Sequence, residues 1–96
     1  MPEVRLRPKA QADLNGIWEY TVETWGFDQA ESYLRALNKT FETISQKPDL
    51  GRVYDEVYPG LRVCPSGKHL IFYFATDQEI DVVRVLHERM DVASHL

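Results

Sequence analysis

Residues 61–86 read LRVCPSGKHLIFYFATDQEIDVVRVL, and this stretch decides the fold. It contains three segments rich in Val, Ile and aromatic residues, a composition typical of strands. The strands are expected at Leu61–Cys64, Lys68–Ala75 and Ile80–Leu86. The turns that separate them are short, Pro65-Ser66-Gly67 and Asp77-Gln78-Glu79. Because such short turns join neighbouring strands that run in opposite directions, the stretch predicts a three-stranded antiparallel meander.

Upstream of these strands, apolar residues repeat with the period of an α-helix. One stripe is formed by Leu14, Ile17, Trp18, Val22 and Trp25, and a second by Ala30, Tyr33, Leu34, Leu37, Phe41 and Ile44. Pro8 suits the first turn of the first helix, and Gly26 suits its end. Asp28 is expected to cap the second helix, with Glu31 three residues further on, and Pro48 to stop it. About two residues join the helices, so they should form an antiparallel hairpin.

The two ends of the chain complete this layout. Val4-Arg5-Leu6-Arg7 alternates with period two and predicts a short N-terminal strand with Val4 and Leu6 inward. Residues Glu88–Leu96 are expected to form a short polar tail. The sequence thus predicts a single α+β domain over residues 1–96, in which a two-helix hairpin covers one face of a small antiparallel sheet.

The formal net charge of −4 is distributed unevenly along the chain. Residues 10–50 carry three basic and seven acidic side chains, whereas Val57–Thr76 has no acid and contains Arg62, Lys68 and His69. The acidic total argues against a general nucleic-acid binder, which usually presents a strongly basic face. We therefore expect any contact with DNA to be indirect, through a protein partner.

The sequence also bears on the compartment. The longest apolar run, Leu70–Ala75, has six residues, far short of the roughly 18 that a membrane span needs. The N-terminus lacks the basic start and apolar stretch of a secretory signal. A single cysteine, Cys64, cannot form an intramolecular disulfide, which suits a reducing compartment. We expect a cytoplasmic protein without a membrane partner.

Side chains that could bind a metal or act as nucleophiles are scattered. His69, His87 and His95 are widely spaced and Cys64 has no close partner, so none of the paired-ligand spacings of zinc sites occurs. Cys64 lies within an apolar strand and is expected to be core. No glycine-rich phosphate loop is present. The sequence predicts no metal, no cofactor and no catalytic residue.

Arg84 is harder to explain as a surface residue, because it interrupts an apolar strand. It is expected to share a face with Val82 and Leu86, where an unpaired charge costs several kcal/mol. One interpretation is an internal ion pair with a nearby acid such as Asp81 or Asp91. The other is an arginine that the sheet supplies for binding an anion or a partner.

Arg62 and His87 extend the second interpretation. Arg62 lies on an earlier strand, and His87 ends the strand of Arg84. If the three converge, they form a small basic patch. A guanidinium beside an imidazole could bind phosphate and move protons, as a ribonuclease requires.

Several segments, taken in order, resemble a known family. They are Ala12-Asp13-Leu14, Ile17-Trp18, Trp25-Gly26, Lys47–Gly51, the stretch Gly60–Tyr73 with its GLR and GKH motifs, and Arg84–Asp91, which reads RVLHERMD. Their order and spacing are similar to those of ParE toxins, a branch of the RelE/ParE superfamily, from about Val4 to Leu96. The family fold, two helices on a small antiparallel sheet, agrees with the layout predicted above.

The resemblance implies the toxic component of a type II toxin–antitoxin system. Such a toxin inhibits DNA gyrase without being an enzyme, blocks replication, and is neutralised by a ParD-type antitoxin in a hetero-oligomer. The candidate target-binding residues are Arg62, Arg84, His87, Arg89, Met90 and Asp91. The candidate antitoxin-binding residues are those of the expected edge strand, Val4, Arg5, Leu6 and Arg7.

Two alternatives remain open at this stage. A RelE-like, ribosome-dependent messenger-RNA endoribonuclease would use Arg62 and Arg84 to bind phosphate and His87 as acid or base. The sheet is only thinly basic for that role, and no tyrosine follows Tyr73. The other alternative is a degenerate toxin that only binds its partner and represses transcription with it.

Overall fold

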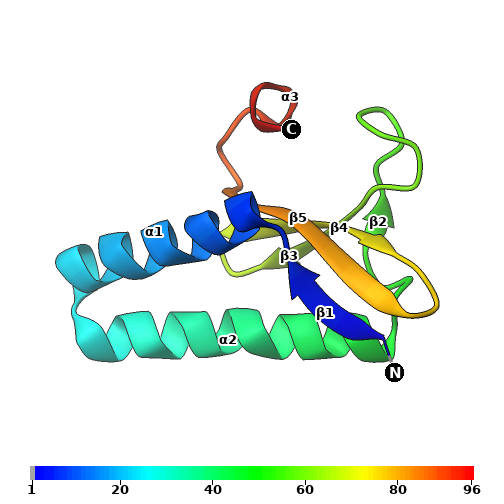
Figure 1. Cartoon of the computed structure of the whole chain (residues 1–96). Helices are drawn as coiled ribbons and strands as arrows, with labels where there is room; N and C mark the ends of the chain where they lie inside the picture. The colour runs from blue at the N-terminus through cyan, green and yellow to red at the C-terminus, as the bar shows by residue number, and fades with distance from the viewer. Residues whose placement is uncertain (1) are drawn as a thin grey trace.

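The computed structural model describes residues 2–96 as an α+β domain (Figure 1). Its elements are β1 (Glu3–Leu6), α1 (Pro8–Trp25), α2 (Phe27–Gln46), β2 (Arg52–Val53), β3 (Arg62–Ser66), β4 (His69–Ala75), β5 (Glu79–His87) and α3 (Val92–His95). The sheet order is β1-β5-β4-β3-β2, with β1 parallel to β5 and the other neighbours antiparallel. The predicted fold class and the meander are confirmed, but the expectation of a wholly antiparallel sheet is wrong, because β1 runs parallel to β5. The structure adds the two-residue strand β2 at one edge of the sheet.

Each face of the sheet carries its own apolar cluster. The cluster under the helical hairpin includes Leu14, Ile17, Leu37, Phe41, Ile44, Ile71, Tyr73, Ile80, Val82, Val85 and the buried Cys64. The second cluster consists of Leu61, Val63, Phe72 and Leu86, with partly buried Val57, Val92 and Leu96 packed against it. The expectation of a purely polar tail is therefore wrong. Alternation along β3 and β4 points apolar side chains to both faces, and the tail supplies cover for the second one.

The hairpin turns at a single residue, Gly26, whose φ of 93° favours glycine. Pro8 begins α1 as expected. The expectation that Asp28 caps α2 is wrong, because α2 already begins at Phe27 and Asp28 lies in its first turn. A carboxylate there still interacts favourably with the positive end of the helix dipole.

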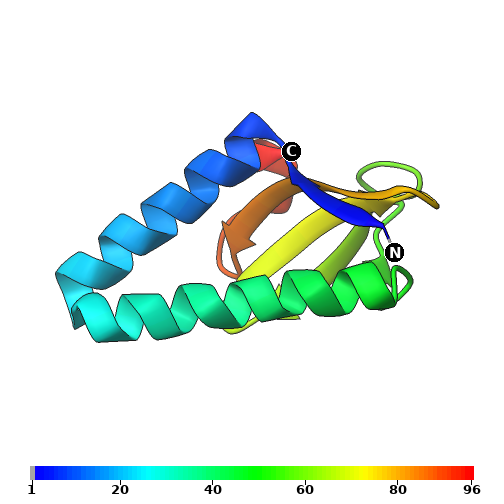
Figure 2. The same ribbon diagram turned by 60° about the horizontal axis from the view of Figure 1, so that its bottom comes forward.

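The far end of the hairpin extends beyond the sheet (Figures 1 and 2). The predicted burial of Trp25 is consequently wrong: this side chain is 70% exposed. Its stripe on α1 continues past the last strand it could pack on. Trp18, nearer the sheet, is partly buried and meets the Phe27 ring edge-on at a centroid distance of 5.4 Å.

A β-bulge in β5 changes which side chains share a face. Arg84 pairs with Phe72 and Val82 pairs with Tyr73, which leaves Val83 as the extra residue. Val82 therefore lies under the hairpin, whereas Arg84 lies opposite Phe72 on the other face. The expectation that Arg84 and Val82 share a face is wrong for this reason.

Candidate functional site

The central polar feature is an ion pair between β5 and α1. The Arg84 guanidinium donates two hydrogen bonds to the Asp13 carboxylate, each 2.8 Å long, and the Val85 backbone N–H donates a third at 2.9 Å. Asp13 thus provides an acceptor for a backbone N–H of β5 that lies beyond the end of β1. The hydrogen bonds to Asp13 raise the pKa of Arg84, although burial opposes this. Arg84 was predicted either to form an internal ion pair or to bind an anion or a partner, and the structure shows the internal ion pair.

The predicted partners of Arg84 were wrong. Asp81 instead accepts two hydrogen bonds from Arg7, at 3.0 and 2.8 Å, across the β1–β5 pair. Asp91 accepts from the backbone of Ala93 and so caps α3. Asp13 is 71 residues from Arg84 in the sequence, and the signal that could have drawn attention to it is its place in the Ala12-Asp13-Leu14 segment of the family resemblance.

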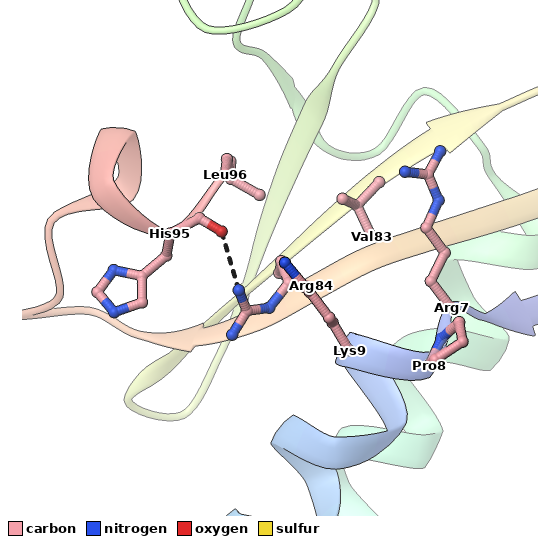
Figure 3. A pocket seen from close by; sticks show the side chains of 7 residues that line it. All are labelled: Arg7, Pro8, Lys9, Val83, Arg84, His95 and Leu96. Carbon is pink, nitrogen blue, oxygen red and sulfur yellow. Dashed lines mark hydrogen bonds between the residues drawn. The ribbon is translucent and has the colours of Figure 1, made fainter.

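The third donor of Arg84 holds the tail. Its Nη1 atom donates to the carbonyl oxygen of His95 at 2.8 Å (Figure 3). This bond closes one side of a pocket of about 380 Å³. The pocket is lined by Arg7, Pro8 and Lys9 from the start of α1, Val83 and Arg84 from β5, and His95 and Leu96 from the tail. Arg7 and Arg84 each form an ion pair with an acid. Lys9 is in none of the ion pairs within residues 2–96, so it gives the pocket an unneutralised positive charge.

The second candidate surface is the outer edge of β1. Glu3 and Arg7 donate their backbone N–H groups to carbonyls at Gln78 and Val82, next to and on β5. Because backbone groups alternate in direction along a strand, the N–H and C=O groups of Val4 and Leu6 point away from β5. The predicted edge strand is confirmed, and within residues 2–96 no strand pairs with its outer side, which leaves room for an added strand.

A histidine pair lies at the other end of the sheet. His69 and His87 are cross-strand partners with ring centroids 5.3 Å apart. The Tyr33 hydroxyl lies 2.6 Å from Nδ1 of His69 and accepts a hydrogen bond from the Lys68 backbone. Burial lowers the pKa of His69, and the nearby His87 lowers it further. Within residues 2–96, no three or more His, Cys, Asp or Glu side chains gather as a metal site would require.

The basic residues considered for phosphate binding do not converge. Arg62 lies opposite Tyr73, on the hairpin face, and donates to the carbonyl of Gly51 at 2.7 Å. Arg84 lies on the other face, and His87 lies at the end of the sheet that is remote from Tyr73. The condition for a basic patch, that Arg62, Arg84 and His87 converge, is therefore not met.

The remaining tail candidates are exposed. Arg89, Met90 and Asp91 follow β5 in the turn before α3, and the Met90 side chain is 45% exposed. Their assignment to target contact stays a prediction, as does the assignment of β1 to antitoxin contact. No helix within residues 2–96 is both long and apolar enough to cross a membrane.

A family model described as the ParE toxin of the type II toxin–antitoxin system parDE matches residues 4–92. The chain belongs to the ParE toxin family. The match begins in β1 and ends at the first residue of α3, so it includes both faces of the sheet and the hairpin.

Relatives named as ParE toxins align with nearly the whole chain. Toxin ParE1 of Mycobacterium tuberculosis is 49% identical over 92 residues, which cover 95% of this chain and 94% of that protein. Toxin ParE1 of Caulobacter vibrioides is 38% identical over 96 residues, covering 100% of this chain and 99% of that one. A solved structure of the "Chromosomal ParDE TA system from P. aeruginosa" has a TM-score of 0.77 at 20% identity, covering 91% and 96% of the two chains. That structural likeness supports the ParE fold alone.

In this ParE-family chain, the motif residues have structural partners. Asp13 of the Ala12-Asp13-Leu14 segment binds Arg84 of the RVLHERMD segment, and Arg62 of the GLR motif binds the turn after α2. Segments that carry the family resemblance are thus joined to one another in space. In this chain, these motif residues help to hold the domain together.

Proposed function

We propose that this ParE-family toxin inhibits DNA gyrase in the cytoplasm and is neutralised by a ParD-type antitoxin. The observation that carries the proposal is the ParE toxin match over residues 4–92, together with relatives named Toxin ParE1 that align over nearly their entire length. The engagement of Arg62 and Arg84 with internal partners also supports an inhibitor that acts by binding.

The proposed antitoxin contact is strand addition along β1. The outward backbone groups of Val4 and Leu6 offer a ladder for an extended segment. The exposed Arg5 side chain and its partner Glu79, 3.3 Å away, lie alongside. The related solved structure from P. aeruginosa is that of a ParDE toxin–antitoxin system, in keeping with a partner of this kind.

A gyrase supercoiling assay tests the target. Purified toxin, added in molar excess to gyrase and relaxed plasmid, should reduce the supercoiled product, and prior mixing with its antitoxin should restore it. Translated messenger RNA, incubated with the same preparation, should stay intact. Normal supercoiling with a toxin that still arrests growth would contradict the proposal, and message cleavage would favour the endoribonuclease.

A proline substitution tests the antitoxin contact. Val4→Pro removes an N–H that points to the free edge, and proline is tolerated at edge strands in that orientation. We expect antitoxin affinity to fall at least tenfold while the toxin remains folded by circular dichroism. Unchanged affinity would place the antitoxin elsewhere.

A further inference from the structure

The tip of the helical hairpin, defined as residues 18–31, carries four aromatic side chains, three of them largely exposed. Tyr20, Trp25 and Phe27 are 66%, 70% and 57% exposed, and Trp18 packs edge-on against Phe27. Aromatic side chains of this exposure have a large area to bury and are the commonest anchors of protein interfaces. Three such side chains within fourteen residues of one projecting turn make the tip a candidate interaction site.

The charged side chains near these aromatic residues are all acidic. From Ala10 to Leu34 the sequence contains no Lys, Arg or His. Glu19, Glu23 and Asp28 are exposed, and the four ion pairs within residues 2–96 leave all three without a cation. The tip therefore combines aromatic faces with uncompensated negative charge, and both features attract cationic side chains.

The position of the tip separates it from the other surfaces. Both views show the turn between α1 and α2 projecting beyond the sheet, away from β1 and away from the tail (Figures 1 and 2). The tip is therefore a surface separate from the β1 edge. A second copy of the chain is disfavoured there, because it would set acid against acid.

We propose that the hairpin tip docks on the basic surface with which the toxin's target holds DNA. This inference rests on the proposed function, in which the target is gyrase. Proteins that hold DNA line their surface with Lys and Arg to neutralise phosphates. An acidic tip with aromatic faces complements such a surface, and DNA and toxin then compete for it.

A binding experiment with intact gyrase tests this directly. The tip variant Glu19→Gln/Glu23→Gln/Asp28→Asn removes three charges, and a second variant, Trp25→Ala/Phe27→Ala, removes the exposed rings. The matched control, Glu42→Gln/Glu56→Gln/Asp77→Asn, removes three exposed acids elsewhere and gives the same net charge. Gyrase affinity is measured for each toxin, with and without a DNA duplex, at two salt concentrations.

We expect both tip variants to bind gyrase at least tenfold more weakly than wild type, and the control to stay within twofold. Duplex DNA and added salt should weaken wild-type binding, and antitoxin affinity should be unchanged in every variant. Thermal unfolding of each variant verifies that it is folded, and the substituted side chains are exposed, so the fold should survive.

The remaining outcomes overturn the inference in distinguishable ways. Wild-type toxin that neither binds gyrase nor slows supercoiling would remove the proposed function and this inference with it. If both tip variants bind gyrase as tightly as wild type, the tip is not the docking site, and the proposed function stands. If the tip variants lose antitoxin binding, the antitoxin is the partner that occupies the tip. If wild-type toxin forms a concentration-dependent dimer that the tip variants abolish, the partner is a second copy of the chain.

Discussion

At the scale of single residues, the Asp13 carboxylate links helix α1 to strand β5 and, through Arg84, to the tail. It accepts from Arg84 and from the Val85 backbone, and Arg84 in turn holds His95 of the tail. The side chains of Asp13 and Arg84 are 14% and 16% exposed, so solvent screens their interaction weakly.

Asp13→Ala should lower the free energy of unfolding by about 2–4 kcal/mol, because it leaves a largely buried guanidinium and a strand N–H without an acceptor. Urea denaturation measures the change. Glu31→Ala is the control: its pair with Arg35 is exposed and should contribute only about 0.5 kcal/mol or less. A loss for Asp13→Ala as small as that of the control would contradict the structural role.

The His69 imidazole makes stability depend on pH. Burial, aided by repulsion from His87, lowers its pKa below the ordinary value of 6.5, against a weaker pull from Asp13 and Glu88. The unfolded chain therefore takes up a proton that the folded chain resists, so stability is lost as pH falls from 6.5 toward the lower folded pKa.

The expected loss is at most about 1.4 kcal/mol per pH unit in that window. Free energies of unfolding at two pH values, one above and one below the ordinary histidine pKa, are compared between wild type and His69→Gln. The variant should lose less stability than wild type between the two conditions. Parallel losses in both proteins would assign the pH dependence to other groups.

At the scale of elements, the turn from α2 to β2 is fixed by Tyr73 of β4. The buried Tyr73 hydroxyl donates to the Pro48 carbonyl at 2.9 Å and accepts from the Gly51 N–H at 2.8 Å. A Cβ atom at Gly51 would come within 2.5 Å of that hydroxyl oxygen. Glycine is required at position 51 because the backbone lies so close to the Tyr73 ring.

Gly51→Ala should accordingly destabilise the protein by about 2–4 kcal/mol, because a fully buried ring has no room to move. Gly16→Ala is the matched control. Its Cβ would meet nothing within 4 Å on an exposed helix face, and it should stabilise by about 0.5–1 kcal/mol. Thermal and urea unfolding of both variants give the comparison, and equal effects would contradict it.

The tail is the other element whose place depends on packing. α3 has four residues and could not persist alone, so its position depends on Val92 and Leu96 at the second cluster. Val92→Ser/Leu96→Ser should cost about 1–3 kcal/mol and make the tail protease-sensitive. Met90→Ser, at an exposed site, should do neither, and a protected tail in the double variant would contradict this packing.

At the scale of the whole molecule, the free β1 edge and the acidic hairpin tip are separate surfaces. A partner that binds only the folded toxin stabilises it by mass action. At a free antitoxin concentration about one hundred times Kd, the gain is about 2.7 kcal/mol, which should raise the toxin's Tm by about 10–20 °C.

Differential scanning calorimetry of the toxin with its antitoxin checks this expectation. With its affinity at least tenfold weaker, Val4→Pro toxin should show about half this rise or less under the same conditions. Trp25→Ala/Phe27→Ala toxin should show the wild-type rise. An equal rise for Val4→Pro would contradict strand addition on β1.

Most of the architecture follows from patterns within short segments. The stripe on α2, the meander from Arg62 to His87 and the Pro8 start of α1 were predictable, because periodicity, turn residues and proline act locally. The start of α2 was not, since Gly26 takes the capping position expected of Asp28 and helix boundaries depend on how tightly the preceding turn closes. Local chemistry thus predicted the elements better than their ends.

The sequence by itself therefore determined the fold class, the order of the first strand, the helical hairpin and the meander, the buried cysteine and the ParE resemblance. Only the tertiary structure decided the partner of Arg84, the exposure of Trp25, the cover of the second face and the separation of Arg62 from His87. The physical reason is distance along the chain. Asp13 and Arg84 meet because α1 begins where β1 ends beside β5, a consequence of strand order and of one bulge that no local pattern in the sequence reveals.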